Sequence, residues 1–249
     1  MDQNLTDAIQ ARYSQVLAQI AESERKSGRA AGSVKLLVVT KTHPVETVRA
    51  AIEAGIRELG ENYAEEAAAK VAAIGPVDGL TWHMIGHVQS RKADLVAQNF
   101  DWVHSLDSLK LANRLDRFAG EAGRRVKVLL ECNVGGEESK FGYSDPEALF
   151  RDVEQILHLS NLEIHGLMTM PPLFDDPELS RPFFARLREL ADLLSKRFPP
   201  GCWDQLSMGT SADFTVAVAE GATIVRVGTA IFGARPPKGE SGPEQPPVG

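Results

Sequence analysis

Short apolar runs alternate with helix-like segments along most of this chain. Eight runs have the length and composition of strands: LLVVTK (Leu36–Lys41), IRELGEN (Ile56–Asn62), TWHMIGH (Thr81–His87), DWVHSLD (Asp101–Asp107), VKVLLECNV (Val126–Val134), LEIHGLMTM (Leu162–Met170), DQLSMG (Asp204–Gly209) and TIVRVGT (Thr223–Thr229). Strands that alternate with helices predict a parallel sheet, and eight of them favour a single (β/α)8 TIM-type barrel over an open, doubly wound sheet. No GxGxxG or GxxxxGKS/T motif follows any run, which argues against a nucleotide-binding sheet.

The helix-like segments carry residues that suit helix ends. Apolar residues at helical spacing predict an amphipathic helix from Leu5 to about Lys26 at the start of the chain. Pro44 suits a first helical turn, and Gly55 suits the end of the same helix. Ser108 and Ser144 are placed to cap the helices that follow them.

The end of the chain differs from the rest. After the eighth run there is only AIFGAR, followed by the Pro- and Gly-rich segment PPKGESGPEQPPVG, which has too few apolar residues to pack. We therefore predict that the barrel lacks a full helix after its eighth strand and that the N-terminal helix covers the gap. The expected organisation is one barrel domain over residues 1–235 and a disordered tail over residues 236–249.

Composition narrows the possible partners. With 43% hydrophobic and 24% charged residues among 249, the chain has the mix of a soluble globular protein. Its formal charge is -7 and it has no basic block, so we expect neither a nucleic-acid nor a membrane partner. The absence of a signal-like N-terminus and of a long apolar stretch predicts a cytoplasmic protein. Cys132 and Cys202 are too few for a disulfide framework, and Cys132 is expected to be a buried thiol.

Candidate chemistry lies at the carboxyl ends of the predicted strands, where barrels of this type place their functional residues. The loop Ser207-Met208-Gly209-Thr210-Ser211 and the pair Gly228–Thr229 follow the last two strands, the position of a recurrent phosphate site. Hydroxyl groups, backbone N–H groups and the start of a helix expected near Ala212 favour an anion there. An ordinary turn with a helix cap is the alternative interpretation.

Two cations complete the candidate site. Arg226 interrupts an apolar strand, so it requires a partner in the barrel mouth, either a ligand or a strand-end carboxylate such as Glu61. Lys41 ends the first strand. A lysine in such a mouth either faces solvent or has its pKa lowered from about 10.4 toward roughly 7–8, and the neutral amine then forms a Schiff base with an aldehyde. The histidines and cysteines show no metal-ligand spacing, so no metal is predicted.

Six blocks of the chain resemble one protein family. The segments VVTKTHP, GENYAEE, WHMIGHVQSRK, HGLMTMPP, LSMGTSADF and VRVGTAIFGAR are similar to the pyridoxal phosphate homeostasis proteins, once called proline synthetase co-transcribed homologues. These blocks run in order from about Leu36 to Arg235. The family's fold resembles the N-terminal barrel of alanine racemase, which agrees with the eight runs.

The resemblance implies a cofactor and the residues that hold it. It implies that Lys41 carries pyridoxal 5′-phosphate as a Schiff base, that Arg226 faces the pyridine nitrogen, and that Asn62 lines the pocket. It also implies that the SMGTS loop, with Ser207, Gly209, Thr210 and Ser211, and the pair Gly228–Thr229 hold the phosphate. An arginine at the ring nitrogen disfavours ring protonation and weakens the electron sink that amino-acid chemistry needs.

This chain departs from the family pattern at two positions. His87 stands where proline is common, and Thr210 stands where the family usually has methionine. A rim histidine near the cofactor ring would alter cofactor tautomer or release, although a solvent-facing side chain is the simpler expectation. Neither departure affects Lys41 or Arg226.

Three functions fit these residues. The favoured hypothesis is a monomeric, non-enzymatic protein that binds pyridoxal phosphate reversibly and supplies apo forms of enzymes that use it. The alternatives are an amino-acid racemase and a Schiff-base aldolase. A racemase needs a second base opposite the lysine, and the chain offers no room for the β-rich domain that supplies it in alanine racemases. Schiff-base aldolases usually carry their lysine on a middle or late strand, whereas Lys41 ends the first.

Overall fold

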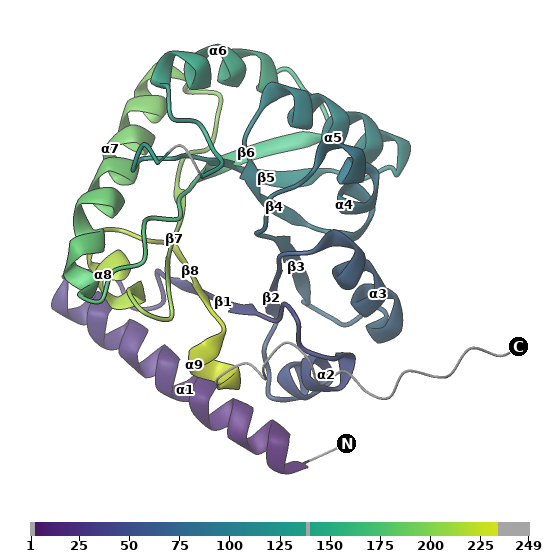
Figure 1. The fold of residues 1–249 in the computed structure, drawn as a ribbon, viewed down its shortest axis with the longest axis vertical. Coiled ribbons are helices and arrows are strands. Elements are labelled where there is room, and N and C mark those ends of the chain that lie inside the picture. Colours follow the sequence, from purple (N-terminus) through teal and green to yellow (C-terminus); the bar gives the residue numbers. More distant parts are fainter. Residues whose placement is uncertain (1–2, 138–139, 234–249) are drawn as a thin grey trace, which may run out of the picture.

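The fold is a closed barrel of eight parallel strands surrounded by helices (Figure 1). The structure is a computed structural model, and it describes residues 3–137 and 140–233. The strands follow one another around the barrel in chain order: β1 (Lys35–Val39), β2 (Glu58–Glu61), β3 (Thr81–Met84), β4 (Trp102–Leu106), β5 (Val126–Glu131), β6 (Leu162–Met168), β7 (Gln205–Thr210) and β8 (Ile224–Val227). Pairing of β1 with β8, with Val38 opposite Val227, closes the ring.

Helices connect the strands on the outside of the barrel. They are α1 (Gln3–Lys26), α2 (Val45–Glu53), α3 (Ala64–Ile74), α4 (Ala93–Asn99), α5 (Leu109–Glu121), α6 (Pro146–Ile156), α7 (Arg181–Arg197), α8 (Phe214–Ala219) and α9 (Thr229–Phe232), with 3-10 turns η1 (Ser90–Lys92) and η2 (Pro177–Ser180). None of these described helices is both long enough and apolar enough to cross a membrane.

Helix α5 shows how the local sequence produces these elements. The hydroxyl of Ser108 accepts a hydrogen bond from the backbone N–H of Leu111 and so caps the first turn. Leu111, Leu115 and Ala119 recur at four-residue intervals and are buried against the barrel. Gly123 follows the helix with φ of 64°, a conformation that glycine adopts without steric cost.

Alternation along the strands creates two separate apolar layers. Leu37, Trp102, Leu129, Met168 and Ile224 form a small cluster inside the barrel. The remaining buried residues form a much larger cluster, which fills the space between the sheet and the helices. Because successive residues of a strand point to opposite faces, membership of these clusters shows which other side chains on the same strand point into the barrel.

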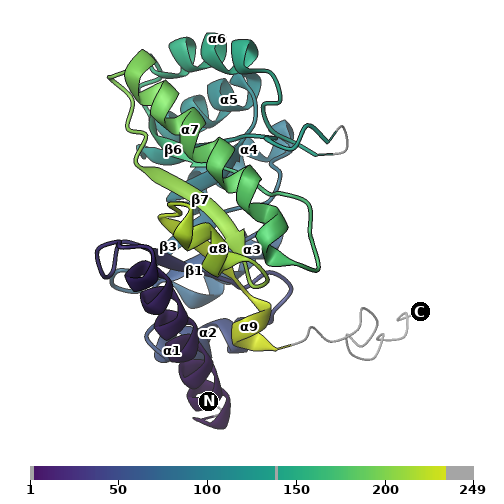
Figure 2. The same ribbon diagram turned by 90° about the vertical axis from the view of Figure 1, so that its left-hand side faces the viewer.

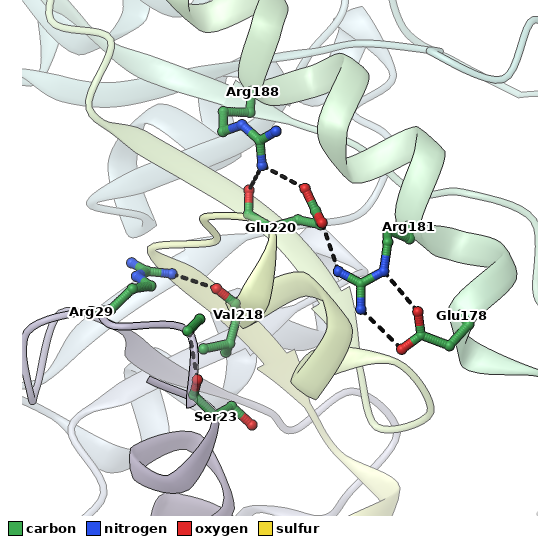
Figure 3. Close-up of polar contacts among 8 residues, drawn as sticks. Ser23, Arg29, Glu178, Arg181, Arg188, Val218 and Glu220 are labelled. Atoms are coloured by element: carbon green, nitrogen blue, oxygen red, sulfur yellow. Dashed lines mark hydrogen bonds and ion pairs between the residues drawn. The ribbon is translucent and has the colours of Figure 1, made fainter. Parts of the chain in front are cut away.

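Helix α1 covers the barrel next to its last strand. It contacts α2, α8 and α9, and Figure 2 shows it along one side of the barrel beside α2. Helix α9 has only four residues, so it leaves surface that α1 covers. Figure 3 shows the polar contacts around α8: Arg181 and Arg188 of α7 both reach Glu220 at its end, and Arg29, which follows α1, donates to the carbonyl of Val218.

The sequence predicted this architecture well. Each of the eight expected runs overlaps a strand, and the expected N-terminal helix, the cap at Ser108 and the end at Gly55 are all present. Ser144 was a wrong prediction, because Asp145 is the residue that caps α6, accepting from the N–H groups of Glu147 and Ala148. The predicted tail, residues 236–249, and the last two residues of the predicted domain lie outside the described residues.

Candidate functional site

The carboxyl ends of β1, β2 and β8 bring three predicted site residues to the barrel mouth. Leu37 lies inside the barrel, so alternation directs Lys41 to the same side just beyond the end of β1. A Cβ on Gly60 would contact Leu37, which places Gly60, and by alternation Asn62, on the inner face of β2. Arg226 is buried within β8, two residues after the interior residue Ile224.

The backbone around Lys41 is held in an unusual conformation. Thr42, the next residue, has φ of 64°. It is the one non-glycine residue with positive φ among the residues that the structure describes, and β-branched residues rarely adopt this region. Its N–H donates to Glu66 Oε1 of α3 at 2.6 Å. Strain of this kind persists only where neighbouring groups impose it, and here it lies beside a candidate functional residue.

A buried ion-pair cluster imposes this conformation from outside the sheet. Lys70 of α3 donates to Glu61 Oε1 at 2.7 Å, to Glu66 Oε1 at 2.6 Å and to the carbonyl of Thr40 at 2.8 Å. The hydroxyl of Thr40 also donates to Glu61 Oε1, at 2.7 Å. The residues before and after Lys41 are thus fixed through one lysine, and we call Thr40, Glu61, Glu66 and Lys70 the outer cluster.

Arg226 does not pair with Glu61, which the sequence had offered as one possible partner. Its guanidinium donates to Ser207 Oγ at 2.6 Å, to the carbonyl of Thr169 at 2.8 Å and to Met170 Sδ at 2.8 Å. Burial lowers the pKa of Arg226 to about 10, against the opposing effect of Asp213 and Glu131. The side chain is therefore a buried cation at neutral pH whose direct partners in the described chain are uncharged.

The segment expected to form a loop after the seventh strand, Ser207–Ser211, lies largely within β7. Ser207 is fully buried beneath Arg226, and the N–H and hydroxyl of Thr210 both donate to Asp213 Oδ1, at 2.7 and 3.0 Å. Helix α8 begins at Phe214, two residues later than expected, and has six residues. Gly209 has φ of 91°, and a Cβ there would lie 2.5 Å from Cβ of Ala217. The glycine therefore lets the end of β7 pack directly on α8.

Lys41 and the residues after β8 share a small cavity. Val39, Lys41, His43, Gly228, Thr229 and Gly233 line it. The N–H of Gly228 donates to Ser211 Oγ at 3.3 Å, which joins the loops after β7 and β8. The ends of β1, β7 and β8 therefore bring together Lys41, Ser211, Gly228 and Thr229, four of the residues predicted from the sequence.

Two buried oxygen atoms in the mouth have no hydrogen-bond partner in the described structure. They are Oδ1 of Asn62 and Oε2 of Glu131. Burial, with the nearby charge of Asp107, raises the pKa of Glu131 to about 7 although Arg226 opposes the shift. Orphaned buried polar atoms are rare in folded proteins, and at a barrel mouth they fit a site that a polar ligand completes. Glu131 carries no distinguishing signal in the sequence, because a carboxylate at a strand end is common.

His87, one of the two departures from the family pattern, lies at the rim of the barrel mouth. Its ring stacks on Phe141 with a centroid separation of 3.6 Å, and Nδ1 lies 3.2 Å from Asp107 Oδ2. His87 also lines a cavity of about 410 Å³ together with Asn62. The side chain is 33% exposed, so it is a partly solvated rim residue that contacts the same space as Asn62.

The opposite end of the barrel holds one group of potential metal ligands. Among the described residues, donor atoms of His165, Cys202 and Asp204 lie within 4.8 Å of one another. They come from β6 and from the segment that leads into β7, at the amino ends of these strands. The group is therefore separate from the barrel mouth, and spacing along the sequence did not reveal it.

The closed barrel is of the alanine racemase N-terminal type. The family described as "Alanine racemase, N-terminal domain" matches residues 15–236. An alanine racemase of Clostridium difficile superposes with a TM-score of 0.68 at 15% identity, covering 93% of this chain and 58% of the racemase. At that identity the likeness concerns the fold alone.

Closer relatives identify the family. Proteins named pyridoxal phosphate homeostasis protein are 42% identical in Vibrio alginolyticus, over 92% of this chain and 98% of the relative, and 39% identical in Escherichia coli (strain K12), over 89% and 94%. The structure of PipY of Synechococcus elongatus PCC7942, described as having PLP bound, is 41% identical with a TM-score of 0.76 and covers 86% of this chain and all of PipY. The chain belongs to the pyridoxal phosphate homeostasis protein family.

Proposed function

We propose that this chain binds pyridoxal 5′-phosphate through Lys41 and holds it reversibly as part of intracellular pyridoxal phosphate homeostasis. The observation that carries the proposal is the position of Lys41, which lines a cavity of about 10 Å³ with Gly228 and Thr229 at the end of the barrel where β8 also carries the buried cation Arg226. When bound, the cofactor supplies an aldehyde that a primary amine captures as a Schiff base, with release of water. Membership of the family and the PLP-bound relative support this choice of ligand.

In this proposal Lys41 is presented by a rigid loop. The outer cluster fixes Thr40 before it and, through Glu66, Thr42 after it, so the amine is directed into the mouth without a large ordering cost. Asn62 Oδ1 and Glu131 Oε2, both without partners in the described structure, line the same mouth and are available to polar atoms of the ligand or to water.

Arg226 is assigned to the pyridine nitrogen. A guanidinium whose pKa is about 10 stays charged at neutral pH and donates hydrogen bonds only. Facing it, the ring nitrogen remains an acceptor without its own proton, and the ring is then a weak electron sink. This arrangement supports storage of the cofactor rather than efficient amino-acid chemistry.

The phosphate is assigned to the side of the mouth where β1, β7 and β8 meet. Ser211 and Thr229 offer hydroxyl groups there, Gly228 lines the same cavity and donates its N–H to Ser211, and Gly209 lets the end of β7 pack closely on α8. Thr210 contributes only through the path of its backbone, because its N–H and hydroxyl groups both donate to Asp213. Ser207 contributes indirectly, by supporting Arg226.

A racemase-like activity is the second candidate, and Glu131 is the observation that favours it. A mouth carboxyl with a pKa of about 7 is able to accept and donate a proton near neutrality. Incubation of the loaded protein with L-alanine in D₂O tests this directly. We expect deuterium to enter the α position no faster than with free pyridoxal phosphate. Exchange at least tenfold faster that disappears in Glu131→Gln would establish the racemase alternative instead.

The proposed ligand is tested by titrating the purified protein with pyridoxal phosphate and recording absorbance. We expect a new visible band that saturates at one equivalent, that is absent in Lys41→Ala and that is retained in Lys140→Ala. Lys140 is a suitable control because it also lines a cavity near the mouth, with Glu131 and Met170. A wild-type protein that stays colourless and takes up no pyridoxal phosphate would favour an aldolase acting on another aldehyde.

If the protein holds pyridoxal phosphate reversibly, the loaded protein should release it to an acceptor. Mixed with the apo form of an enzyme that uses pyridoxal phosphate, it should restore that enzyme's activity, while the borohydride-reduced protein should not. We expect the donor to elute as a monomer in size-exclusion chromatography. Failure to restore activity although the cofactor dissociates freely in dialysis would argue against a role in supply.

A further inference from the structure

A continuous line of polar side chains crosses the inside of the barrel beneath Arg226. Ser207 Oγ lies 2.6 Å from Nη1 of Arg226 and 2.9 Å from Nδ1 of His104. Nε2 of His104 lies 3.0 Å from Nδ1 of His83, whose Nε2 lies 2.6 Å from Oε2 of Glu58. Glu58 begins β2, so the line starts at the mouth and ends at the opposite end of the barrel. We call these five residues the inner chain.

The inner chain is shielded from water over most of its length. The side chains of His83, His104 and Ser207 have no exposed surface, and Arg226 is 4% exposed. Only Glu58 meets solvent, with 22% of its side chain exposed, and it pairs there with Lys35 at 2.8 Å. Burial lowers the pKa of both histidines, so each ring is neutral and carries a single N–H.

The charged end in the mouth fixes the direction of the first hydrogen bonds. A guanidinium only donates, so Nη1 of Arg226 donates to Ser207. The Ser207 hydroxyl has one proton, and of its two side-chain partners in the described structure only Nδ1 of His104 is able to accept it. His104 therefore carries its proton on Nε2 and donates to Nδ1 of His83.

The other end fixes the same direction independently. Hydrogen bonds from His83 and Lys35 keep the pKa of Glu58 below its ordinary value, although burial acts to raise it, so Glu58 is a carboxylate. A carboxylate only accepts, and the group 2.6 Å away on His83 must therefore be an Nε2–H. His83 is left with an unprotonated Nδ1, which is the acceptor that His104 requires. The two ends agree on one arrangement.

We propose that His83 and His104 are positioning residues for the cofactor, since with Ser207 they tie Arg226 to Glu58 through hydrogen bonds that all point from the mouth to the far end of the barrel. The proposal rests on the proposed function, in which Arg226 faces the ring nitrogen. Polarised hydrogen bonds thereby link the buried guanidinium, whose charged form Asp213 and Glu131 also favour, to the carboxylate of Glu58. They also fix the guanidinium in one orientation toward the mouth.

Imidazole nitrogen NMR of the ligand-free protein at pH 7.5 tests the inner chain without the cofactor. We expect both His83 and His104 to be neutral and protonated on Nε2, with the signals assigned from His83→Gln and His104→Gln. A proton on Nδ1 of either ring, or a charged ring, overturns the proposed direction. Because no ligand is present, this outcome is independent of whether the proposed function holds.

Removal of the remote charge tests the effect on the cofactor. Glu58→Gln preserves size and an acceptor but removes the carboxylate at the far end. We expect about three- to tenfold weaker binding of pyridoxal phosphate and a changed ratio of its absorbance bands. Glu163→Gln is the matched control, since Glu163 is a partly exposed carboxylate on β6 that pairs with Arg125 and lies outside the inner chain.

Replacement within the inner chain completes the test. The amide of His104→Gln offers both a donor and an acceptor, so it should retain more affinity and a more native spectrum than His104→Leu. The proposal fails if Glu58→Gln and Glu163→Gln give the same affinity and the same spectrum in folded proteins. A wild-type protein that binds no pyridoxal phosphate refutes the proposed function instead, and the NMR result then stands by itself.

Discussion

The two carboxylates of strand β2 belong to two different buried networks. Glu58 points into the barrel and ends the inner chain, whereas Glu61 points outward and joins Lys70 in the outer cluster. The outer cluster is compact and contains a direct ion pair, but the inner chain separates its opposite charges by three uncharged side chains. Both networks reach the mouth: the outer cluster holds the backbone around Lys41, and the inner chain holds Arg226. One strand thus supports both cations of the candidate site, from opposite faces.

The largest expected effect comes from the outer cluster. Lys70→Met leaves Glu61 and Glu66 without their cation in a buried setting, so we expect a loss of about 3–5 kcal/mol in the free energy of unfolding. Urea denaturation measures this loss. The matched control is Lys92→Met, because Lys92 makes an ion pair with Glu65 at a far more exposed position, where the effect should stay below about 1 kcal/mol. Equal losses in the two variants would show that the outer cluster is not a structural ion pair.

The next largest effect distinguishes the inner chain, which supports Arg226, from the outer cluster, which supports the backbone around Lys41. Ser207→Ala removes the link between Arg226 and His104 and should cost about 1–3 kcal/mol of stability. It should also weaken binding of pyridoxal phosphate. Thr40→Val, the matched change in the outer cluster, removes one hydroxyl bond to Glu61 and should cost about 1 kcal/mol.

Calorimetry and ligand titration of the same two variants provide the comparison. For equal losses of stability, Ser207→Ala should lose more affinity than Thr40→Val, because only Ser207 contacts Arg226 directly. The reverse order of affinities would mean that the lysine loop, rather than the arginine, limits binding.

The smallest effect concerns Glu131, which belongs to neither network. Its pKa rises to about 7 in the folded protein from an ordinary value of 4.5, so folding favours its protonated form. The associated stability is present below pH 4.5 and is lost as the pH rises through about 7. Glu131→Gln lacks this loss. We compare the melting temperature of this variant with that of the wild type at two pH values. The difference, variant minus wild type, should be roughly 2–4 °C larger at pH 8 than at pH 5, which corresponds to about 1 kcal/mol after screening by water in the mouth. A melting-temperature difference between the two proteins that stays constant from pH 5 to pH 8 would contradict the raised pKa of Glu131.

The strands were predictable, and the principal candidate residues could be proposed, because both depend on local patterns. Apolar runs bounded by turn residues marked all eight strands, and their order alone indicated the barrel. Lys41 and Arg226 were recognisable as charges at positions where apolar residues surround them. The resemblance to the family added Asn62, and its roles for all these residues remain predictions.

The networks were not predictable because they depend on register between distant segments. His83 and His104 lie within apolar runs and gave no sign of a functional role, and the hydrogen bond between His104 and Ser207 joins residues 103 positions apart. Register shifts between β4 and β5 and between β7 and β8 break simple alternation at these strands. The donors of Thr210 were assigned to phosphate because no pattern indicates that Asp213 turns back to accept them.

Reduction with borohydride followed by peptide mass spectrometry identifies the lysine that forms the Schiff base with pyridoxal phosphate. The protein is loaded with pyridoxal phosphate, reduced, digested and searched for a phosphopyridoxyl group on each of its lysines. If Lys41 forms the Schiff base, we expect one modified site, Lys41, at about one group per chain, and an unmodified Lys140 in the same sample. A reduced adduct distributed over surface lysines, or located on Lys140 with Lys41 unmodified, would contradict it.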